Sequence, residues 1–230
     1  MTSPPKPQSS PNEEGRSLEA ALSALPIFPL PQVVLFPEAV LPLHVFEPRY
    51  RAMLAHCLAT HGALAIAQVI SGEDEHGRPR IAPVAGGGII VEHQALADGR
   101  SNIVVLGKAR LALEELDPDD SRPYRVARAH ILEDAKVTVA EHDRTALVAA
   151  ATMFATEVKK HDPHFAFRVP AMLDTAHLAD LCAFQLVVDA GARQRVLDEL
   201  DPRARVRMVL RQLALQHGAM MRDGGDRVLN

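Results

Sequence analysis

The prolines of segment 34–54, VLFPEAVLPLHVFEPRYRAML, constrain the fold of this chain more than any other feature. Pro37, Pro42 and Pro48 each lack a backbone N–H donor, so none of them can occupy the middle of a central strand. The apolar residues between the first two prolines nevertheless need burial. We therefore expect short extended pieces at the edge of a sheet, laid over a core.

The third proline marks a change from strand to helix. From Tyr50 onward, apolar residues recur at the spacing of one helix face. Pro48 suits the first helical turn, where its missing donor costs nothing. Glu47 lies where the helix dipole favours an anion, and Gly62 is expected to close the segment. The stretch FEPRY thus predicts a strand-to-helix joint in which Phe46 and Tyr50 face the core.

Residues 25–134 show the pattern of a β-rich region. Short apolar runs alternate with turn signals such as Asp98-Gly99, a strong hairpin sequence. The run SNIVVLGKARLALEEL is expected to form two strands that break near Gly107. Several short strands with one inserted helix indicate a small barrel or a folded sheet.

Residues 140–218 change to helical periodicity. Asp174 is a candidate N-cap for one helix. Asp201, followed by a proline at the first helical position, begins the last helix, which is expected to end before Gly218. The chain is therefore predicted to be α+β, with a helical bundle after the β-rich region.

The termini and the composition set further limits. Residues 1–24 are rich in Pro, Ser and charge and are expected to form a disordered tail, and residues 219–230 a flexible one. No apolar run is long enough to span a membrane or to act as a secretory signal, which predicts a cytoplasmic protein. Cys57 and Cys182 lie on apolar helical faces, so we expect free buried thiols, with a disulfide as the alternative. The net charge of −4 and the 4% aromatic content disfavour a nucleic-acid binder.

No constellation of catalytic residues is recognisable. The triplet Gly86-Gly87-Gly88 leads into a strand, whereas a phosphate loop leads into a helix, so we interpret it as backbone freedom at a strand start. His161 and His164 are too few for a zinc site. No serine stands in a nucleophile elbow. We therefore expect no catalytic residues, no cofactor, no metal and no enzyme activity.

Segment 25–54 resembles the start of the Lon protease N-terminal, substrate-binding domain. The pattern P-L-x-x-F-E-x-R-Y of that family is matched here by Pro42, Leu43, Phe46, Glu47, Arg49 and Tyr50. DGRSNIVVLGKARLALEEL resembles a strand pair of the family, and the leucine-rich segment 178–213 resembles its helical end. The resemblance covers residues 25–217 as one domain.

This resemblance implies a PUA-like pseudo-barrel followed by a helical bundle, and a substrate-binding role. The family's ATPase module and its protease domain with a Ser–Lys dyad would follow the matched region, but the sequence ends at Asn230. No catalytic residue is carried over. We therefore expect a stand-alone, non-catalytic module linked to proteolysis or protein quality control.

The expected partners are unfolded or partly folded protein segments, docked in a groove between barrel and helices. A separate protease and a homo-oligomer also stay open as partners. For each candidate residue, plain core packing is the alternative. Arg49 could bind a partner's carboxylate or pair with Glu47. The candidates that line the groove are Phe36, Leu41, Leu43, Phe46, Arg49 and Tyr50.

Two other classes of function remain open. One is a small-ligand-binding or hydrolytic protein that uses a pocket in the barrel. The other is a PUA-like RNA binder, which the net charge and the sparse aromatic residues disfavour.

Overall fold

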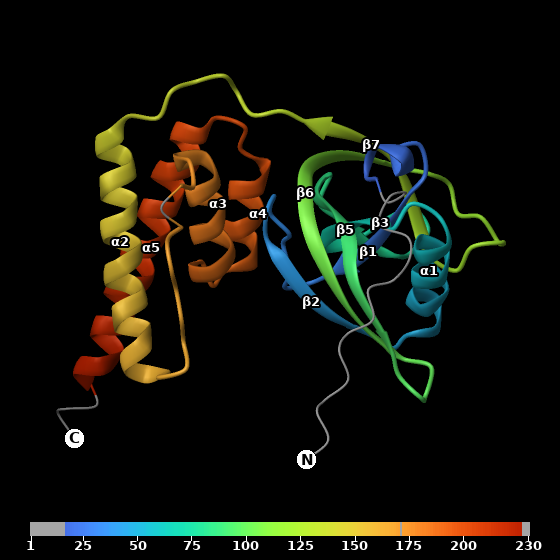
Figure 1. The fold of residues 1–230 in the computed structure, drawn as a ribbon, viewed down its shortest axis with the longest axis horizontal. Coiled ribbons are helices and arrows are strands. Elements are labelled where there is room, and N and C mark those ends of the chain that lie inside the picture. Colours follow the sequence, from blue (N-terminus) through green and yellow to red (C-terminus); the bar gives the residue numbers. More distant parts are fainter. Residues whose placement is uncertain (1–16, 171, 227–230) are drawn as a thin grey trace, which may run out of the picture.

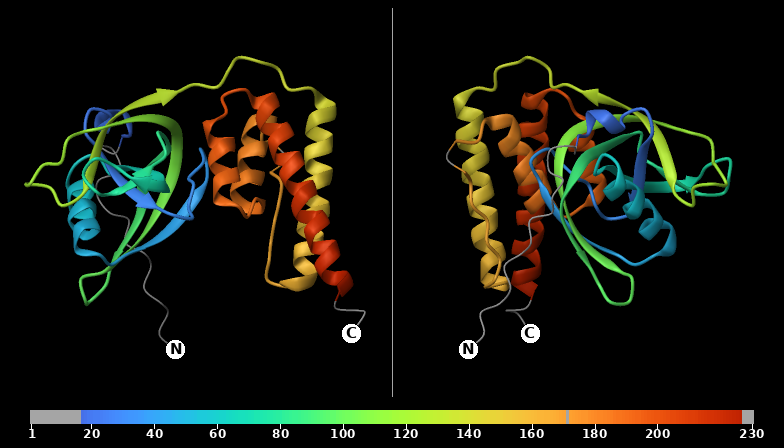
Figure 2. Two further views of the ribbon diagram at one scale, coloured as in Figure 1. Left: turned by 180° about the vertical axis from the view of Figure 1, so that it is seen from behind. Right: turned by 45° about the vertical axis from the view of Figure 1, so that its right-hand side comes forward.

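A β-barrel and a bundle of helices lie side by side and are joined by one linker (Figure 1). The computed structural model describes residues 17–170 and 172–226. The predicted α+β class is confirmed. The two further views show the same separation, with the helices next to one wall of the barrel (Figure 2).

The barrel consists of seven strands in the order β1-β7-β6-β5-β3-β4, with β2 paired to β6. A parallel pairing of β1 with β3 closes the circle. The helix α1 (Pro48–Ala59) is inserted between β2 and β3, as predicted, with Pro48 in its first turn. The strands are β1 (Leu25–Leu30), β2 (Val40–Val45), β3 (Ala63–Glu73), β4 (Pro79–Ile81), β5 (Val84–Ala95), β6 (Ser101–Glu115) and β7 (Arg125–Leu132).

Two strands share the same edge of β6. The first half of β6 pairs with β2, up to Leu106, and the second half pairs with β7, from Arg110. Only β7 also pairs with β1. Among the described residues the barrel is therefore closed where β7 lies and open between β1 and β2.

Pro42 explains why β2 can stand at that opening. The carbonyl of Ala39 accepts a hydrogen bond from Gly107 N–H, so alternate residues from Ala39 onward face β6. Pro42 lies between two such residues, so its backbone nitrogen points away from β6 toward the open edge. Its missing N–H therefore removes no hydrogen bond between the strands. The edge position predicted from the prolines is thus the one observed.

The expected break in β6 near Gly107 is wrong. β6 is one continuous strand of 15 residues, and its register against β5 shifts at Lys108. A bulge of this kind bends a strand without ending it. The glycines serve close approach: a Cβ on Gly107 would lie 2.0 Å from the carbonyl oxygen of Phe36, and one on Gly86 equally close to that of Leu35.

The helical bundle contains four helices, of which α4 contacts β5 of the barrel, and one apolar core is shared by bundle and barrel. Asp174 and Asp189 cap α3 and α4. Each side chain accepts a hydrogen bond from the backbone N–H of the residue three positions later. α5 does not end before Gly218 but continues to Asp226, because Met220 still packs against the core and offsets the cost of a helical glycine. The helices are α2 (Glu141–His161), α3 (Thr175–Leu186), α4 (Ala190–Asp198) and α5 (Pro202–Asp226).

The N-terminal boundary also differs from the prediction. Residues 17–24, expected in the tail, include the 3-10 turn η2 (Glu19–Ala21). Leu18 and Ala21 are buried in a small second core with Leu25, because burial of their side chains offsets the entropy of ordering the turn. The expectations for residues 1–16 and 227–230 lie outside the described residues.

Candidate functional site

A groove of about 980 Å³ occupies the open side of the barrel. Its walls are the end of β1, the end of β2, the start of α1 and the loops before β4 and β7. The volume lies at the upper end of the range for small-molecule pockets. The lining apolar and aromatic residues are Phe28, Pro29, Leu30, Pro31, Leu43, Phe46, Tyr50, Val69, Pro79, Pro118, Pro123 and Tyr124.

Aromatic side chains concentrate in this groove. Both tyrosines of the chain, Tyr50 and Tyr124, line it, together with two of its seven phenylalanines. The rings of Phe28 and Tyr50 lie 4.4 Å apart and form a fixed floor. Phe46 stacks on His44 at the lip and is 57% exposed. The groove therefore offers apolar surface that the chain itself leaves uncovered.

Four of the six residues predicted from the sequence line the groove: Leu43, Phe46, Arg49 and Tyr50. The other two do not. Phe36 is completely buried and Leu41 is buried at 8% exposure, both in the main core. The structure thus brings only part of the predicted set together at one surface.

The inward orientation predicted for Phe46 is wrong, whereas that of Tyr50 is observed. Val45 is the last residue of β2 and takes the inward position with no exposed surface. Because side chains alternate along a strand, the next residue, Phe46, points outward. Tyr50 is buried on the first turn of α1.

Arg49 makes an internal pair, one of the two alternatives considered for it. Its Nε donates to Glu47 Oε2 at 2.9 Å, and its guanidinium lies 4.6 Å from the centre of the Tyr50 ring. These contacts hold Arg49 on the lip of the groove. Glu47 itself makes no side-chain cap to the helix.

The rim opposite α1 is held by arginine–carboxylate pairs that the sequence did not reveal. Arg78 donates to Asp74 at 2.8 Å, and Arg125 donates to Glu115 at 2.5 Å. Burial acts to raise the pKa of Asp74, but hydrogen bonds from Arg78 and from backbone N–H groups outweigh it and lower the pKa to about 2. On the next loop, Arg122 pairs with Asp119. The run of carboxylates between Glu114 and Asp120 is the only signal of these pairs in the sequence.

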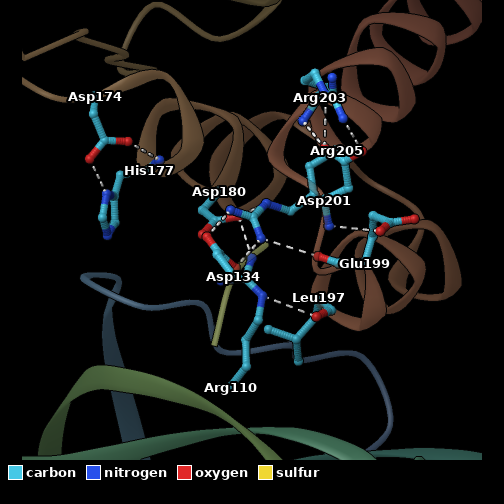
Figure 3. A network of polar contacts seen from close by, with 10 residues as sticks. All are labelled: Arg110, Asp134, Asp174, His177, Asp180, Leu197, Glu199, Asp201, Arg203 and Arg205. Carbon is cyan, nitrogen blue, oxygen red and sulfur yellow. Dashed lines mark hydrogen bonds and ion pairs between the residues drawn. The ribbon is translucent and has the colours of Figure 1, made fainter. Parts of the chain in front are cut away.

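A second polar cluster is buried between barrel and helices (Figure 3). Arg110 of β6 donates to Asp180 of α3 at 2.5 Å and to the carbonyl of Leu197. Arg205 of α5 lies 3.4 Å from the same Asp180 carboxylate and donates to Asp134 of the linker. Burial raises the pKa of Asp180 against the opposing effect of Arg110. Because these charges satisfy one another, we assign the cluster to joining the two parts of the fold.

The part of the chain that the structure describes has no group of three or more His, Cys, Asp or Glu residues placed to hold a metal ion. None of its helices combines the length and the apolar character needed to cross a bilayer. Cys57 and Cys182 are free and buried, as predicted.

The fold has counterparts among solved structures. The Lon N-terminal domain protein from Xanthomonas campestris superposes with a TM-score of 0.62 at 21% identity, covering 81% of this chain and 96% of that one. The N-terminal domain of the Mycobacterium avium complex Lon protease gives 0.63 at 16% identity, covering 83% and 98%. The class defined by the fold is therefore that of Lon N-terminal domains.

The chain belongs to the family of the ATP-dependent protease La (LON) substrate-binding domain, whose model matches residues 24–214. The Lon protease of Roseiflexus castenholzii is 33% identical over 192 residues, which is 81% of this chain and 23% of that protein. The Lon protease of Anaeromyxobacter dehalogenans is 28% identical over 83% of this chain and 23% of that protein. The chain thus spans about a quarter of the length of these relatives.

Proposed function

We propose that the groove binds extended, largely apolar segments of unfolded or partly folded proteins, without catalysing a reaction. The observation that carries this proposal is the exposed Phe46 at the lip of an aromatic groove. Large exposed apolar patches on soluble proteins mark sites of interaction. Phe46 is the outermost of four aromatic rings that line one continuous hollow.

The charges of the rim support a segment of low net charge as the ligand. Arg49, Arg78, Arg122 and Arg125 each have a carboxylate partner within the protein. Paired guanidinium groups give little net attraction for the phosphates of nucleic acid. Affinity would then come from apolar side chains entering the groove, at about 25 cal/mol for each Å² of apolar surface removed from water.

The family supports a role in substrate recognition for proteolysis. The relatives are named as Lon proteases, and the matched part is the domain named for binding substrates. In this proposal the groove presents clients to a protease, either a separate partner or one continuous with this chain. A cytoplasmic location, where unfolded chains meet ATP-dependent proteases, is part of the proposal.

Phe46→Ala provides the test, with Val40→Ala as a matched control. Both residues are large, apolar and more than half exposed, but Val40 is on the outer face of β2 and does not line the groove. Binding of fluorescently labelled, reduced and carboxymethylated lactalbumin is measured by anisotropy. We expect Phe46→Ala to weaken binding at least about fivefold, which corresponds to about 1 kcal/mol, a loss that only a minority of interface residues cause. Equal affinities of the two variants would refute the proposed site.

The enzymatic alternative has its own test. Purified protein is incubated with ATP and with labelled casein, and phosphate release and fragment formation are followed. We expect neither to exceed background. Turnover that persists through a second purification would overturn the non-catalytic assignment.

A further inference from the structure

A second pocket, of about 350 Å³, lies on the helical bundle and shares no lining residue with the groove. One of its walls is a face of α2, and the other is segment 165–169, which follows that helix in the sequence. The lining residues of α2 fall on one side of the helix. They are Val148, Thr152, Ala155, Thr156 and Lys159. The pocket is therefore bounded by a helix on one side and by non-helical chain on the other.

Segment 165–169 is extended but belongs to no sheet. Its odd-numbered residues are partly buried against the core, whereas Ala166 and Arg168 are exposed. This alternation is that of a strand. Pro170 also favours an extended conformation in the residue before it. Figure 1 shows the segment as an open trace along the bundle, on the way from α2 to α3.

The backbone of this segment is available for pairing. Phe165 N–H donates to the carbonyl of Asp162, at 3.0 Å. From Ala166 to Val169, no backbone N–H or carbonyl makes a hydrogen bond within residues 17–170 and 172–226. An extended segment with free N–H and carbonyl groups is a template to which another strand can be added. The pocket can therefore hold an extended ligand by its backbone.

The charges of the pocket are positive and unpaired. Lys159 on α2 and Arg168 on the segment both line it, and neither forms an ion pair with any residue that the structure describes. No aspartate or glutamate is among the lining residues. Glu157, on the same helix, is paired with Lys160 and does not line the pocket. The pocket therefore favours carboxylates, which can accept hydrogen bonds from both cations.

We propose that this pocket binds an acidic, extended segment of another protein as a strand added to residues 165–169, with its carboxylates at Lys159 and Arg168. Backbone hydrogen bonds supply affinity for an extended chain, and the two cations select acidic side chains. Because alternate side chains of a strand share one face, the ligand carries an acidic residue at every second position. The inference does not rest on the aromatic groove, which is a separate surface.

The charge selection is tested on the full chain with an N-acetylated, fluorescently labelled heptapeptide that alternates glutamate and valine. Binding is measured by anisotropy at low ionic strength, where exposed charges are least screened. We expect Lys159→Gln combined with Arg168→Gln to weaken binding at least about fivefold. Lys136→Gln combined with Arg207→Gln is the matched control, because it removes the same charge from exposed residues that do not line the pocket. Equal losses in the two double variants would overturn the proposed site.

Two methylated peptides test the pairing of backbones. One is methylated at the backbone nitrogens of its glutamates and the other at those of its valines, so each loses the N–H donors of one edge only. A strand added to residues 165–169 pairs through one edge, so we expect one peptide to bind at least about tenfold more weakly than the other. Equal affinities of the two, whether high or low, would overturn strand addition. Phe46→Ala should leave the binding of the unmethylated peptide unchanged, which separates this test from that of the proposed function.

Discussion

The groove and the buried polar cluster between barrel and helices, here called the buried joint, both contain ion pairs but differ in their exposure to water. Each contains arginine–carboxylate pairs at hydrogen-bond distance. In the joint, the side chains of Arg110, Asp180 and Arg205 are at most 4% exposed, whereas those of Arg122 and Asp119 at the groove are 38% and 41% exposed. Exposed pairs are screened by water and contribute little to stability, but breaking a buried pair leaves an uncompensated charge. Burial thus separates the region that holds the fold together from the region available to a partner.

The largest effect is expected from Asp180→Asn in the joint. The substitution leaves Arg110 and Arg205 buried without their shared carboxylate, which should lower the free energy of unfolding by about 3–5 kcal/mol. Asp119→Asn at the groove is the matched control and should stay within about 0.5 kcal/mol of the unmodified protein. Urea denaturation measures both. Similar losses for the two variants would erase the distinction between the regions.

Two phenylalanines give the same comparison for apolar residues. Phe36 is completely buried, and Phe36→Ala should lower the free energy of unfolding by about 3–5 kcal/mol. Phe46→Ala removes a side chain that is 57% exposed and should cost less than about 1 kcal/mol. Thermal and urea unfolding of the pair decide the matter. A loss of several kcal/mol for Phe46→Ala would mean that this residue belongs to the core and not to the groove.

A smaller effect concerns the acid stability of the joint. Burial acts to raise the pKa of Asp134, but its hydrogen bond and ion pair with Arg205 lower the pKa overall. A lowered pKa adds stability that is present above the unfolded value, about 3.9, and is lost as the pH falls through the folded value. The free energy of unfolding should fall below about pH 4, and less steeply in Asp134→Asn. Parallel pH profiles for the two proteins would contradict this linkage.

The smallest effect is one of reactivity rather than stability. Burial raises the pKa of both Cys57 and Cys182 to about 12. At pH 8 only about one thiol in ten thousand is then ionised, so labelling by a thiol reagent should be very slow until urea unfolds the chain. Time courses in native and denaturing buffer test this. Fast labelling of Cys182 alone would point to loosening of the helical bundle.

The sequence predicted the parts of the fold that depend on local pattern. Pro48 in the first turn of α1 and Asp174 as a cap follow from neighbouring residues only. The prediction that Phe46 points inward was wrong because its orientation depends on the residue at which β2 ends. Periodicity does not fix that end to a single residue. Arg110 and its partner Asp180 are 70 residues apart, so no local pattern could reveal their pairing.

The candidate site was predictable to the same limited degree. Four of its predicted residues come from the segment that resembles the family, and they share the groove. The far wall, with Tyr124 and Arg125, comes from the start of β7, which only the closure of the barrel brings near α1. The buried Phe36 and Leu41 lie in the same segment, and their closeness in sequence to the groove residues does not distinguish core positions from surface positions.

The pairing of β1 with β7 has a consequence for the order of folding. Leu25 pairs with Ala127, about a hundred residues later in the sequence. Closing this long loop costs conformational entropy, and the pairing can form only after β7 has been made. The bundle, by contrast, is built from helices whose backbone hydrogen bonds are local, although α5 packs mainly on α2 and α3, which are not adjacent to it in sequence. Both β1 and β2 would leave the ribosome long before β7. The barrel wall would therefore remain incomplete during synthesis, with its inner apolar strands accessible to chaperones until residue 132 has emerged.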